Sequence, residues 1–316
     1  MEPSHAALIG LDWGTSRLRA YLFDAEGAVA EFKDRPWGVL SPPDGGFERA
    51  YHDVTGEWHA RRPGLPAVAC GMIGSTVGWV AAPYCACPAG LQELAAAVVA
   101  ATTQQGVLHV IPGVELRGAT PDLMRGEETQ IAGALALHPD LAASGTFVLP
   151  GTHAKWVAVR DGRIARFTTY LTGELFALLS ERSILSRPLR TAVPAGAGEV
   201  AWDTFERGVR AARDNPAGGI APLLFRTRSL VVQGALRAEE SLEYLSGLLI
   251  GDEICSGSLD ATPELALVGE TALCERYQRA LGLFDIAAPV VDGATPAGLW
   301  QIAGRLGLVS AAATHG

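Results

Sequence analysis

The sequence contains the same order of structural elements twice. Residues 6–37 and 146–171 each run from an apolar strand through a Gly-Thr loop into a second strand, an acidic-Gly turn and a third strand. The loop threonine precedes the turn glycine by 12 residues in the first copy and by 10 residues in the second. Thr15 and Thr152, the two loop threonines, are 137 residues apart. This internal repeat predicts two related lobes, although Gly-Thr loops between strands are also common singly.

Helical and strand patterns in the rest of the chain predict an α/β fold. Apolar residues recur at helical spacing in the segments 91–102, 127–137, 174–185, 203–213 and 239–254. Two apolar segments, 265–268 and 286–291, have the character of strands, and each precedes a glycine-containing turn and a predicted helix. Strand–glycine–helix steps of this kind are typical of α/β domains with parallel strands.

Composition excludes several classes of protein. With 25 Lys and Arg against 34 Asp and Glu, the formal charge is −9, and the sequence has no basic block. Nucleic acids and anionic membranes are therefore poor partners. No apolar stretch is long enough to span a membrane, the N-terminus lacks the features of a signal peptide, and the five cysteines include no CxxC pair. We expect a soluble, cytoplasmic protein without a disulfide framework or a structural zinc site.

The first Gly-Thr loop has the composition of a phosphate-binding site. Asp12 ends an apolar run and is followed by Gly14 and Thr15. A carboxylate beside a tight loop with outward N–H groups suits a Mg²⁺–phosphate complex, whereas the same residues also suit an ordinary Asx turn. The second loop, Gly151-Thr152, favours the phosphate interpretation, because two opposed loops could hold a polyphosphate from both lobes.

The helix predicted at 127–137 begins with two carboxylates, Glu127 and Glu128. Acidic residues at a helix N-terminus are favourable for the helix dipole and for capping, so a purely structural role is one interpretation. The other is that one carboxylate is a general base that accepts the proton of a substrate hydroxyl. Their position in the sequence, between the two Gly-Thr loops, would let them lie at a cleft between the lobes.

Three further features suit ligand binding. Gly269 follows a predicted strand and precedes a helix, where N–H groups could meet an anion or a nucleoside, although most such turns are only connections. Residues 71–84 combine glycines with aromatic side chains, which is typical of a polyol-binding loop and equally of a plain Ω-loop. His153 and Lys155 follow Thr152 and could hold an anionic group of the substrate or of phosphate.

Six strings cover these segments: LIGLDWGTSRLRAYLFD, ACGMIGSTVGWVAAPY, MRGEETQIAGAL, LPGTHAKWVAV, TGELFALLSERSIL and LSGLLIGDEI. In this order they resemble the 2-dehydro-3-deoxygalactonokinase family, sugar-acid kinases of the acetate and sugar kinase/Hsp70/actin superfamily. The resemblance implies an α/β fold with two actin-like (ribonuclease H-like) lobes, mixed sheets flanked by helices and an active-site cleft between the lobes. It implies an N-terminal lobe with sugar-binding loops at 1–140, and a C-terminal lobe with the second phosphate loop and the nucleoside site at 141–316.

The resemblance also implies an activity, the ATP- and Mg²⁺-dependent phosphorylation of 2-dehydro-3-deoxy-D-galactonate at its 6-hydroxyl to 2-dehydro-3-deoxy-6-phosphogalactonate. Asp12 would be the metal-linked carboxylate. The nucleotide contacts would be Asp12, Gly14, Thr15, Gly151, Thr152 and Gly269. The substrate contacts would be Gly71, Met72, Gly74, Trp79, Tyr84, Arg125, His153, Lys155 and Glu174. Arg125 and Lys155 are the candidates for binding the substrate carboxylate.

The base is less firmly placed by the resemblance. The related FGGY sugar kinases have a catalytic Asp at a helix start, and the corresponding string here is Glu127-Glu128-Thr129-Gln130, so that the base would be a Glu. The register of Gln130 favours Glu128, and a slip of one position would make it Glu127. The catalytic set is thus Glu128, Glu127 and Asp12.

Other functions remain open at this point. The chain could phosphorylate another sugar or sugar acid, such as 2-dehydro-3-deoxygluconate, or be a phosphohydrolase or a non-catalytic nucleotide switch of the same superfamily. We expect a small sugar acid as partner. The oligomeric state stays open, a homodimer included.

Overall fold

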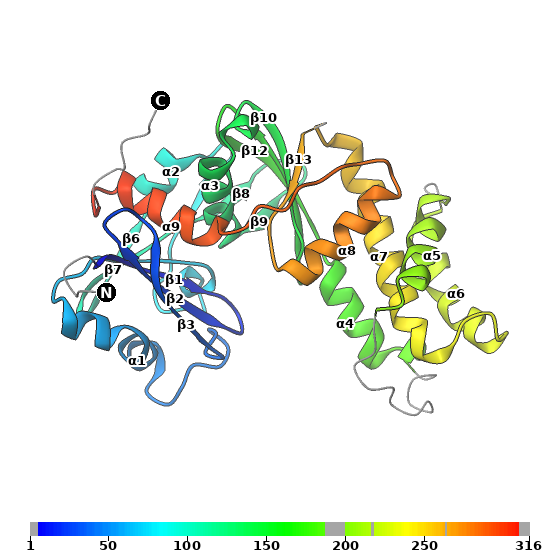
Figure 1. Cartoon of the computed structure of the whole chain (residues 1–316), viewed down its shortest axis with the longest axis horizontal. Helices are drawn as coiled ribbons and strands as arrows, with labels where there is room; N and C mark the ends of the chain where they lie inside the picture. The colour runs from blue at the N-terminus through cyan, green and yellow to red at the C-terminus, as the bar shows by residue number, and fades with distance from the viewer. Residues whose placement is uncertain (1–5, 187–199, 216–217, 263, 310–316) are drawn as a thin grey trace. The chain divides into compact units, whose positions relative to one another are not determined.

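The computed structural model describes residues 6–186, 200–215, 218–262 and 264–309, and its chain divides into two compact units (Figure 1). Unit 1 contains the described residues of Met1–Ser144, Val159–Phe167 and Val291–Gly316, and unit 2 contains those of Gly145–Ala158 and Thr168–Val290. This division differs from the expected single boundary after residue 140. The reason is that a hairpin of the second half and the C-terminal helix both pack within unit 1.

The main sheet of unit 1 has the strand order β3-β2-β1-β4-β7-β6. Its strands are β1 (Ala6–Trp13), β2 (Leu18–Asp24), β3 (Val29–Arg35), β4 (Ala67–Cys70), β6 (Val99–Thr103) and β7 (Gly106–Val110). β1 pairs antiparallel with β2 and parallel with β4. A smaller sheet of order β5-β8-β9 consists of β5 (Tyr84–Ala86), β8 (Gly113–Leu116) and β9 (Asp122–Met124).

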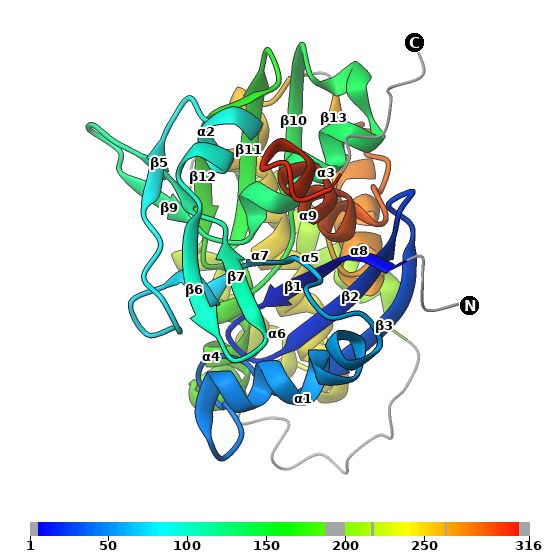
Figure 2. The same ribbon diagram turned by 90° about the vertical axis from the view of Figure 1, so that its left-hand side faces the viewer.

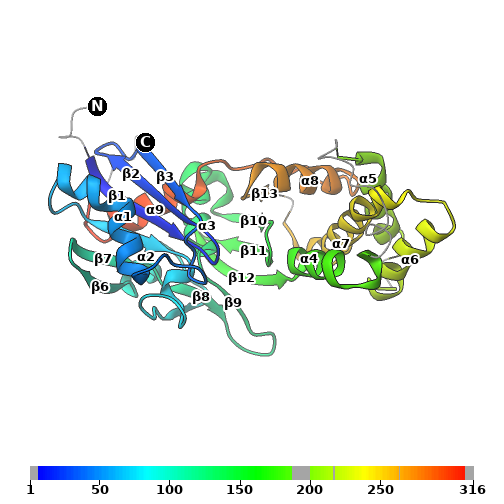
Figure 3. The ribbon, with the colours of Figure 1, turned by 90° about the horizontal axis from the view of Figure 1, so that it is seen from below.

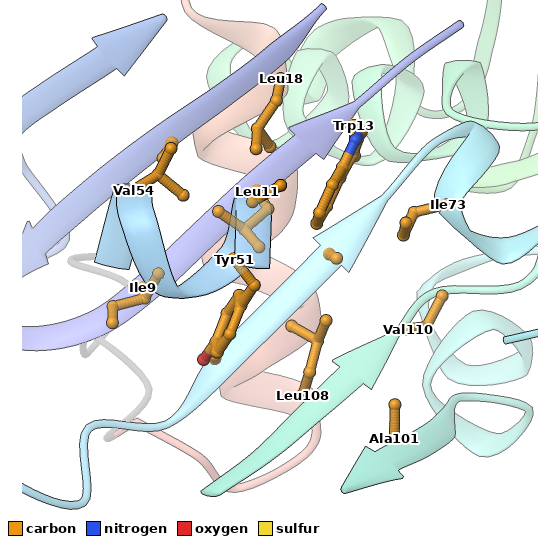
Figure 4. Close-up of a cluster of buried hydrophobic side chains, with 14 of the residues drawn as sticks. Ile9, Leu11, Trp13, Leu18, Tyr51, Val54, Ile73, Ala101, Leu108 and Val110 are labelled. Carbon is orange, nitrogen blue, oxygen red and sulfur yellow. The ribbon is translucent and has the colours of Figure 1, made fainter. Parts of the chain in front are cut away.

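Helices cover both faces of the main sheet of unit 1 (Figure 2). Ile9, Leu11 and Trp13 are buried against α1 (Gly46–Arg61), on the same side as Tyr51 and Val54 (Figure 4). The alternate residues of β1 lie on the side of α9 (Ala294–Arg305), where Gly10 packs close to Leu299, and α9 in turn contacts α2 (Leu91–Ala96) and α3 (Glu127–Leu137). Asp12 is one of these alternate residues, so the local alternation of the strand directs its carboxylate to the side of α3 and α9.

Two glycines allow α3 and α9 to cross at very short range. A Cβ at Gly133 of α3 would lie 1.8 Å from the carbonyl oxygen of Ala294, and a Cβ at Gly298 of α9 would lie 1.9 Å from that of Thr129. Gln130 adds a side-chain hydrogen bond to the hydroxyl of Thr295 at 3.2 Å. This crossing holds the N-terminal end of α3 in place.

The second sheet has the order β12-β11-β10-β13 and contains β10 (Ser144–Leu149), β11 (Ala154–Arg160), β12 (Arg163–Tyr170) and β13 (Leu265–Leu267). β10 pairs parallel with β13, as β1 does with β4. The order therefore repeats β3-β2-β1-β4, which confirms the predicted internal repeat. The residues around the β11–β12 turn belong to unit 1, where Ile164 forms a bridge with Ala89.

Unit 2 is completed by a group of helices: α4 (Thr172–Arg182), α5 (Trp202–Arg213), α6 (Ala221–Val232), α7 (Ser241–Gly257) and α8 (Thr271–Gly282). Figure 3 shows α5 and α6 beside α7. The contact between α5 and α7 is again glycine-mediated, since a Cβ at Gly247 would lie 1.9 Å from the carbonyl oxygen of Phe205.

Two predicted elements differ from the structure. The helix expected at 91–102 ends at Ala96, and Val99–Thr103 is strand β6, because β-branched residues here pair antiparallel with β7. The strand expected at 286–291 forms only a single bridge between Val290 and Leu267. In the described parts of the chain, each helix is too short or too polar to cross a membrane.

Candidate active site

The first Gly-Thr loop is a tight turn held from behind. The N–H of Gly14 donates to the carbonyl oxygen of Arg17 at 2.9 Å, which closes the turn between β1 and β2. Gly38 packs directly on the loop, because a Cβ there would lie 2.0 Å from the carbonyl oxygen of Thr15. The N–H of Val39 also donates to the carbonyl oxygen of Gly14 at 3.0 Å. Thr15 is exposed, so the loop presents one face to solvent while the other is anchored.

Asp12 lies beside this loop in a crowded electrostatic environment. Its Oδ2 accepts a hydrogen bond from Nη1 of Arg19 at 3.1 Å, and the side chain is 19% exposed. Burial raises the pKa of Asp12, the cation of Arg19 opposes this, and the negative charge of Glu127 adds to the rise. A buried carboxylate with a raised pKa and a second carboxylate close by is a place where an added cation is favourable.

Two glycines bring three segments of unit 1 together at the end of β1. Gly71 has a φ of +90°, and a Cβ on it would lie 2.8 Å from the carbonyl oxygen of Trp13. Gly126 has a φ of +110°, and a Cβ on it would lie 3.3 Å from Cα of Gly71. Only glycine combines this backbone conformation with such close approach. The end of β1, the start of the 71–84 loop and the N-terminus of α3 therefore meet at one point.

The two carboxylates at the start of α3 have different surroundings. Glu128 is completely buried, and its carboxylate accepts the N–H of Gly126 at 2.7 Å and the hydroxyl of Thr129 at 3.1 Å. Burial, followed by the charge of Glu127, raises the pKa of Glu128 to about 8. Glu127 is partly exposed and accepts the N–H of Arg125 at 3.0 Å. Of the two, Glu127 is thus the one with access to solvent.

The 71–84 loop is built around Arg125. The guanidinium lies 4.2 Å from the centre of the Tyr84 ring, and its Nη2 donates to the carbonyl oxygen of Ala82 at 2.9 Å. Its Nε and Nη1 are buried and have no hydrogen-bond partner among the described residues. A Cβ at Gly74 would lie 2.9 Å from Nη1, so Gly74 packs closely against the end of this side chain.

The other predicted residues of this loop are partly buried. Met72 lies in a short 3₁₀-helix, Met72–Gly74, and packs against the core of unit 1. The ring of Trp79 lies 6.3 Å from that of Trp13 and 5.9 Å from that of Tyr51, in edge-on or tilted geometry. These contacts anchor the loop to the core, and aromatic pairs of this kind add about 0.5–1.5 kcal/mol beyond area burial.

The second Gly-Thr loop lies between β10 and β11 and is supported by the N-terminus of α4. The N–H of Glu174 donates to the carbonyl oxygen of Thr152 at 3.0 Å, and Nε2 of His153 lies 2.5 Å from Oε2 of Glu174. A Cβ at Gly151 would meet no atom of the described residues within 4 Å, so among these residues this side of the loop is open. The structure thus brings together four residues that the sequence placed in binding roles.

Lys155 and Gly269 lie next to the same loop. Lys155 is only 3% exposed, and its ammonium group donates to the carbonyl oxygen of His153 at 2.9 Å. It therefore lies beneath the loop main chain, a position that the sequence did not predict. A Cβ at Gly269 would lie 3.4 Å from the carbonyl oxygen of Pro150, which brings the turn after β13 against the start of the loop.

The predicted residues thus form two groups, one in each unit. The group in unit 1 comprises Asp12, Gly14, Thr15, Gly71, Met72, Gly74, Trp79, Tyr84, Arg125, Glu127 and Glu128, and the group in unit 2 comprises Gly151, Thr152, His153, Lys155, Glu174 and Gly269. The sequence analysis did not single out Arg19 as a neighbour of Asp12. A signal for it exists, because the short turn between β1 and β2 sets a register in which Asp12 is opposite Arg19. The sequence also did not show that Gly38 packs against Thr15 or that Gly126 packs against Gly71, because these contacts join segments that are distant in the sequence.

Comparison with known proteins assigns the chain to a family. The family model for 2-keto-3-deoxy-galactonokinase matches residues 12–302. The 2-dehydro-3-deoxygalactonokinase of Escherichia coli (strain K12) is 35% identical over 303 residues, which are 94% of this chain and 98% of that protein. A protein of Rhizobium meliloti (strain 1021) assigned the same activity is 36% identical over 299 residues, 92% of this chain and 94% of its own.

Solved structures agree with this assignment. A crystal structure of a Sinorhizobium meliloti protein assigned to the same family has a TM-score of 0.84 and 33% identity, covering 94% of this chain and 98% of that chain. The activator of the 2-hydroxyisocaproyl-CoA dehydratase from Clostridium difficile, solved with ADPNP, has a TM-score of 0.50 at 12% identity, with 94% and 95% of the two chains covered, and is similar in fold alone. The expected α/β fold of the actin-like type is confirmed, and the chain belongs to the 2-keto-3-deoxy-galactonokinase family.

Proposed function

We propose that this protein transfers the γ-phosphoryl group of ATP to the 6-hydroxyl of 2-dehydro-3-deoxy-D-galactonate. The main support is the family match over residues 12–302, together with relatives that carry this name at 35% and 36% identity. The local geometry agrees with phosphoryl transfer, since a half-buried carboxylate, an exposed Gly-Thr loop and a second, partly exposed carboxylate occur together in unit 1. Phosphoryl transfer needs little beyond positioning and charge stabilisation, which such groups provide.

The first Gly-Thr loop and Asp12 are proposed to bind the metal-bound phosphates. Among the described residues, His, Cys, Asp and Glu form no group of three or more that could hold a metal by itself. The donor set nevertheless fits Mg²⁺, which is usually held by one or two carboxylates together with substrate phosphates and water. When bound, Mg²⁺ would neutralise charge on the phosphates. Thr15 would donate its exposed hydroxyl to a phosphate oxygen, and Gly14 would keep the turn beside it tight through its hydrogen bond to Arg17.

The second Gly-Thr loop, in unit 2, is proposed to bind phosphate groups of the nucleotide. Gly151 leaves open space on one side of the loop, and the hydroxyl of Thr152 is exposed beside it. Gly269 adjoins this loop and starts the turn into α8, where free N–H groups suit the nucleoside or an anion. The pair of His153 and Glu174 lies on the same loop and would contact an anionic group at its exposed edge.

Glu127 is the better candidate for the general base. A base must reach the hydroxyl proton, and the Glu128 carboxylate is fully buried and already engaged by Gly126 and Thr129. Glu127 is partly exposed and close enough to Asp12 to influence its pKa. The geometry therefore favours Glu127 as the base, whereas the alignment of Gln130 favours Glu128.

The substrate is proposed to bind at the 71–84 loop. Gly71 and Gly74 keep the main chain of this loop close to β1 and α3, and Met72 and Trp79 anchor it to the core. Tyr84, 36% exposed, is the aromatic face available to a polyol. Arg125 supplies positive charge next to Tyr84 for the substrate carboxylate, while Lys155 acts on the other loop through the carbonyl oxygen of His153.

The reaction then follows from these positions. Glu127 accepts the proton of the 6-hydroxyl as the hydroxyl oxygen forms a bond to the γ-phosphorus. The bond between the γ-phosphorus and the β–γ bridging oxygen breaks, and the electron pair leaves with ADP. The proton stays on Glu127 until solvent removes it. Loop N–H groups that lack an acceptor within the chain would stabilise charge on the phosphoryl oxygens.

The test is a panel of sugars and 2-keto-3-deoxy acids with Mg·ATP, read as ADP release. We expect turnover with 2-dehydro-3-deoxygalactonate and the phosphate on its 6-oxygen. Turnover with the gluconate epimer alone would overturn the choice of substrate. Hydrolysis of ATP that does not depend on any sugar would identify a phosphohydrolase, and nucleotide binding without turnover would identify a switch protein.

A further inference from the structure

Glu253 is a buried carboxylate with three hydrogen-bond donors from three different elements of unit 2. It lies on α7 and is 2% exposed. Nε1 of Trp156 donates to its Oε1 at 2.8 Å, the hydroxyl of Tyr277 donates to its Oε2 at 2.7 Å, and the hydroxyl of Thr172 donates to the same oxygen. A buried carboxylate is costly unless its oxygens are satisfied, so removing it leaves three buried donors without an acceptor.

Two of these donors belong to the elements that carry the second Gly-Thr loop. Trp156 lies on β11, which begins two residues after Thr152. Thr172 is the first residue of α4. The carboxylate of Glu253 therefore ties the strand that leaves the loop to the helix that supports it.

The start of α4 is in direct contact with the loop main chain. A Cβ at Gly173 would lie 2.5 Å from the carbonyl oxygen of Gly151, and the N–H of Glu174 donates to the carbonyl oxygen of Thr152 at 3.0 Å. A shift of the α4 N-terminus would consequently move both loop residues. On the side where a Cβ would lie, no described residue beyond its chain neighbours comes within 4 Å of Gly151.

We infer that Glu253 is a positioning residue for nucleotide binding: by holding Thr172 and Trp156 together, it keeps Gly151 and Thr152 in the conformation that binds phosphate. This inference rests on the proposed role of the second Gly-Thr loop. Within the described part of the chain, the side chain of Glu253 forms no hydrogen bond with Gly151 or Thr152, so its influence passes through β11 and α4. The loop would remain folded without it but would lose its fixed geometry.

The experiment measures the affinity of full-length protein for Mg·AMPPNP by calorimetry, with the melting temperature of each variant recorded. Thr172→Val removes the hydroxyl at almost constant volume, and Thr172→Ser restores it. We expect Thr172→Val and Glu253→Gln to weaken binding about tenfold, because each disturbs a charged, buried hydrogen-bond network. Thr172→Ser should bind within about twofold of wild type.

Glu243→Gln is the matched control. It lies on the same helix, and its carboxylate pairs with Arg276 rather than with an element of the loop. We expect it to change the melting temperature without changing the affinity for Mg·AMPPNP.

The outcomes distinguish a failure of the positioning role of Glu253 from a failure of the proposed kinase function. If wild type phosphorylates the sugar acid while Thr172→Val and Glu253→Gln bind Mg·AMPPNP as tightly as wild type, the positioning role is overturned and the proposed function stands. The positioning role is also overturned if Glu243→Gln weakens binding as much as Glu253→Gln. If wild type binds no Mg·AMPPNP and shows no turnover, both the proposed function and the positioning role fail.

Discussion

Glu127 and Glu128 are adjacent at the start of α3, yet one is partly exposed and the other is completely buried. The buried carboxylate turns back to accept the N–H of Gly126, whereas the exposed one accepts the N–H of Arg125. The N–H of Gly126, the N-cap residue, is one of those that a helix N-terminus leaves unpaired, whereas the N–H of Arg125 precedes the helix. We therefore propose that the capping function and the catalytic function, which the sequence offered as alternatives, are divided between these two neighbouring residues.

The first prediction concerns this division. Glu127→Gln should lower kcat by about 100-fold to 10,000-fold, the range expected for loss of a general base, while leaving the affinity for ATP almost unchanged. Glu128→Gln should retain most of the activity, because its carboxylate does not reach solvent. Steady-state kinetics with both substrates checks this. The opposite pattern, with Glu128→Gln inactive and Glu127→Gln active, would assign the base to Glu128.

The different burial of the two glutamates is a feature that their sequence could not predict. The alignment of Gln130 favours Glu128 as the base. This alignment uses only the spacing of neighbouring residues along the helix and carries no information about burial. Burial depends on what packs against the helix, and here that is decided by Gly126 against Gly71 and by Gly298 against Thr129. These partners are far apart in the chain, so no local pattern could reveal them.

Other features were accessible from sequence to different degrees. The repeated Gly-Thr loops and the start of α3 were predicted because turn glycines and helix N-termini have local signals. The segment 91–102 was assigned to one helix, since its alanines hide the switch to β-branched residues that pair with β7. Lys155 was expected to hold an anionic group, and its burial could not be predicted because it depends on strand alternation inside a packed sheet.

The second prediction is a pH dependence of stability caused by Glu128. Its pKa is raised from 4.5 to about 8, so between these pH values the folded chain keeps a proton that the unfolded chain has lost. This contribution to stability is complete below about pH 4.5 and is lost as the pH rises through about 8. The free energy of unfolding should therefore fall by up to about 1.4 kcal/mol per pH unit on this account.

Glu128→Gln tests this dependence because a neutral amide can accept from Gly126 and donate to the Thr129 hydroxyl. Relative to wild type, the variant should become steadily more stable in urea unfolding between about pH 5 and pH 8. The exposed Glu26→Gln is the control, and its stability relative to wild type should stay level. A constant difference for Glu128→Gln would show that its carboxylate is ionised throughout this range in the folded chain.

The third prediction concerns the crossing of α3 and α9. Gly298→Ala would place a methyl group 1.9 Å from the carbonyl oxygen of Thr129, so the helices must separate. We expect a loss of about 1–3 kcal/mol in the free energy of unfolding, as for other overpacked sites, and a fall in kcat because α3 carries Glu127. Gly304→Ala, in the same helix, meets only Val309 at 4.0 Å and should be neutral or stabilising. Equal stability of the two variants would contradict this account of the crossing.

The fourth prediction concerns Arg125 and the sugar acid. Arg125→Lys keeps the charge but loses the planar group that lies over Tyr84 and donates to Ala82. We expect the KM for the sugar acid to rise about tenfold with little change in the KM for ATP. A rise in the KM for ATP alone would place Arg125 at the nucleotide instead.

The last prediction concerns Asp12 and the metal. Asp12→Asn keeps the shape of the side chain but removes the negative charge that pairs with Arg19 and would bind Mg²⁺. We expect kcat to fall by about 100-fold or more and the Mg²⁺ concentration for half-maximal activity to rise, because a metal bound through few protein oxygens depends strongly on each. Asp53→Asn, which alters a surface pair with Arg49 on α1, is the control and should leave both values unchanged. An Asp12→Asn enzyme with wild-type Mg²⁺ dependence would remove Asp12 from the metal site and leave it as the partner of Arg19 alone.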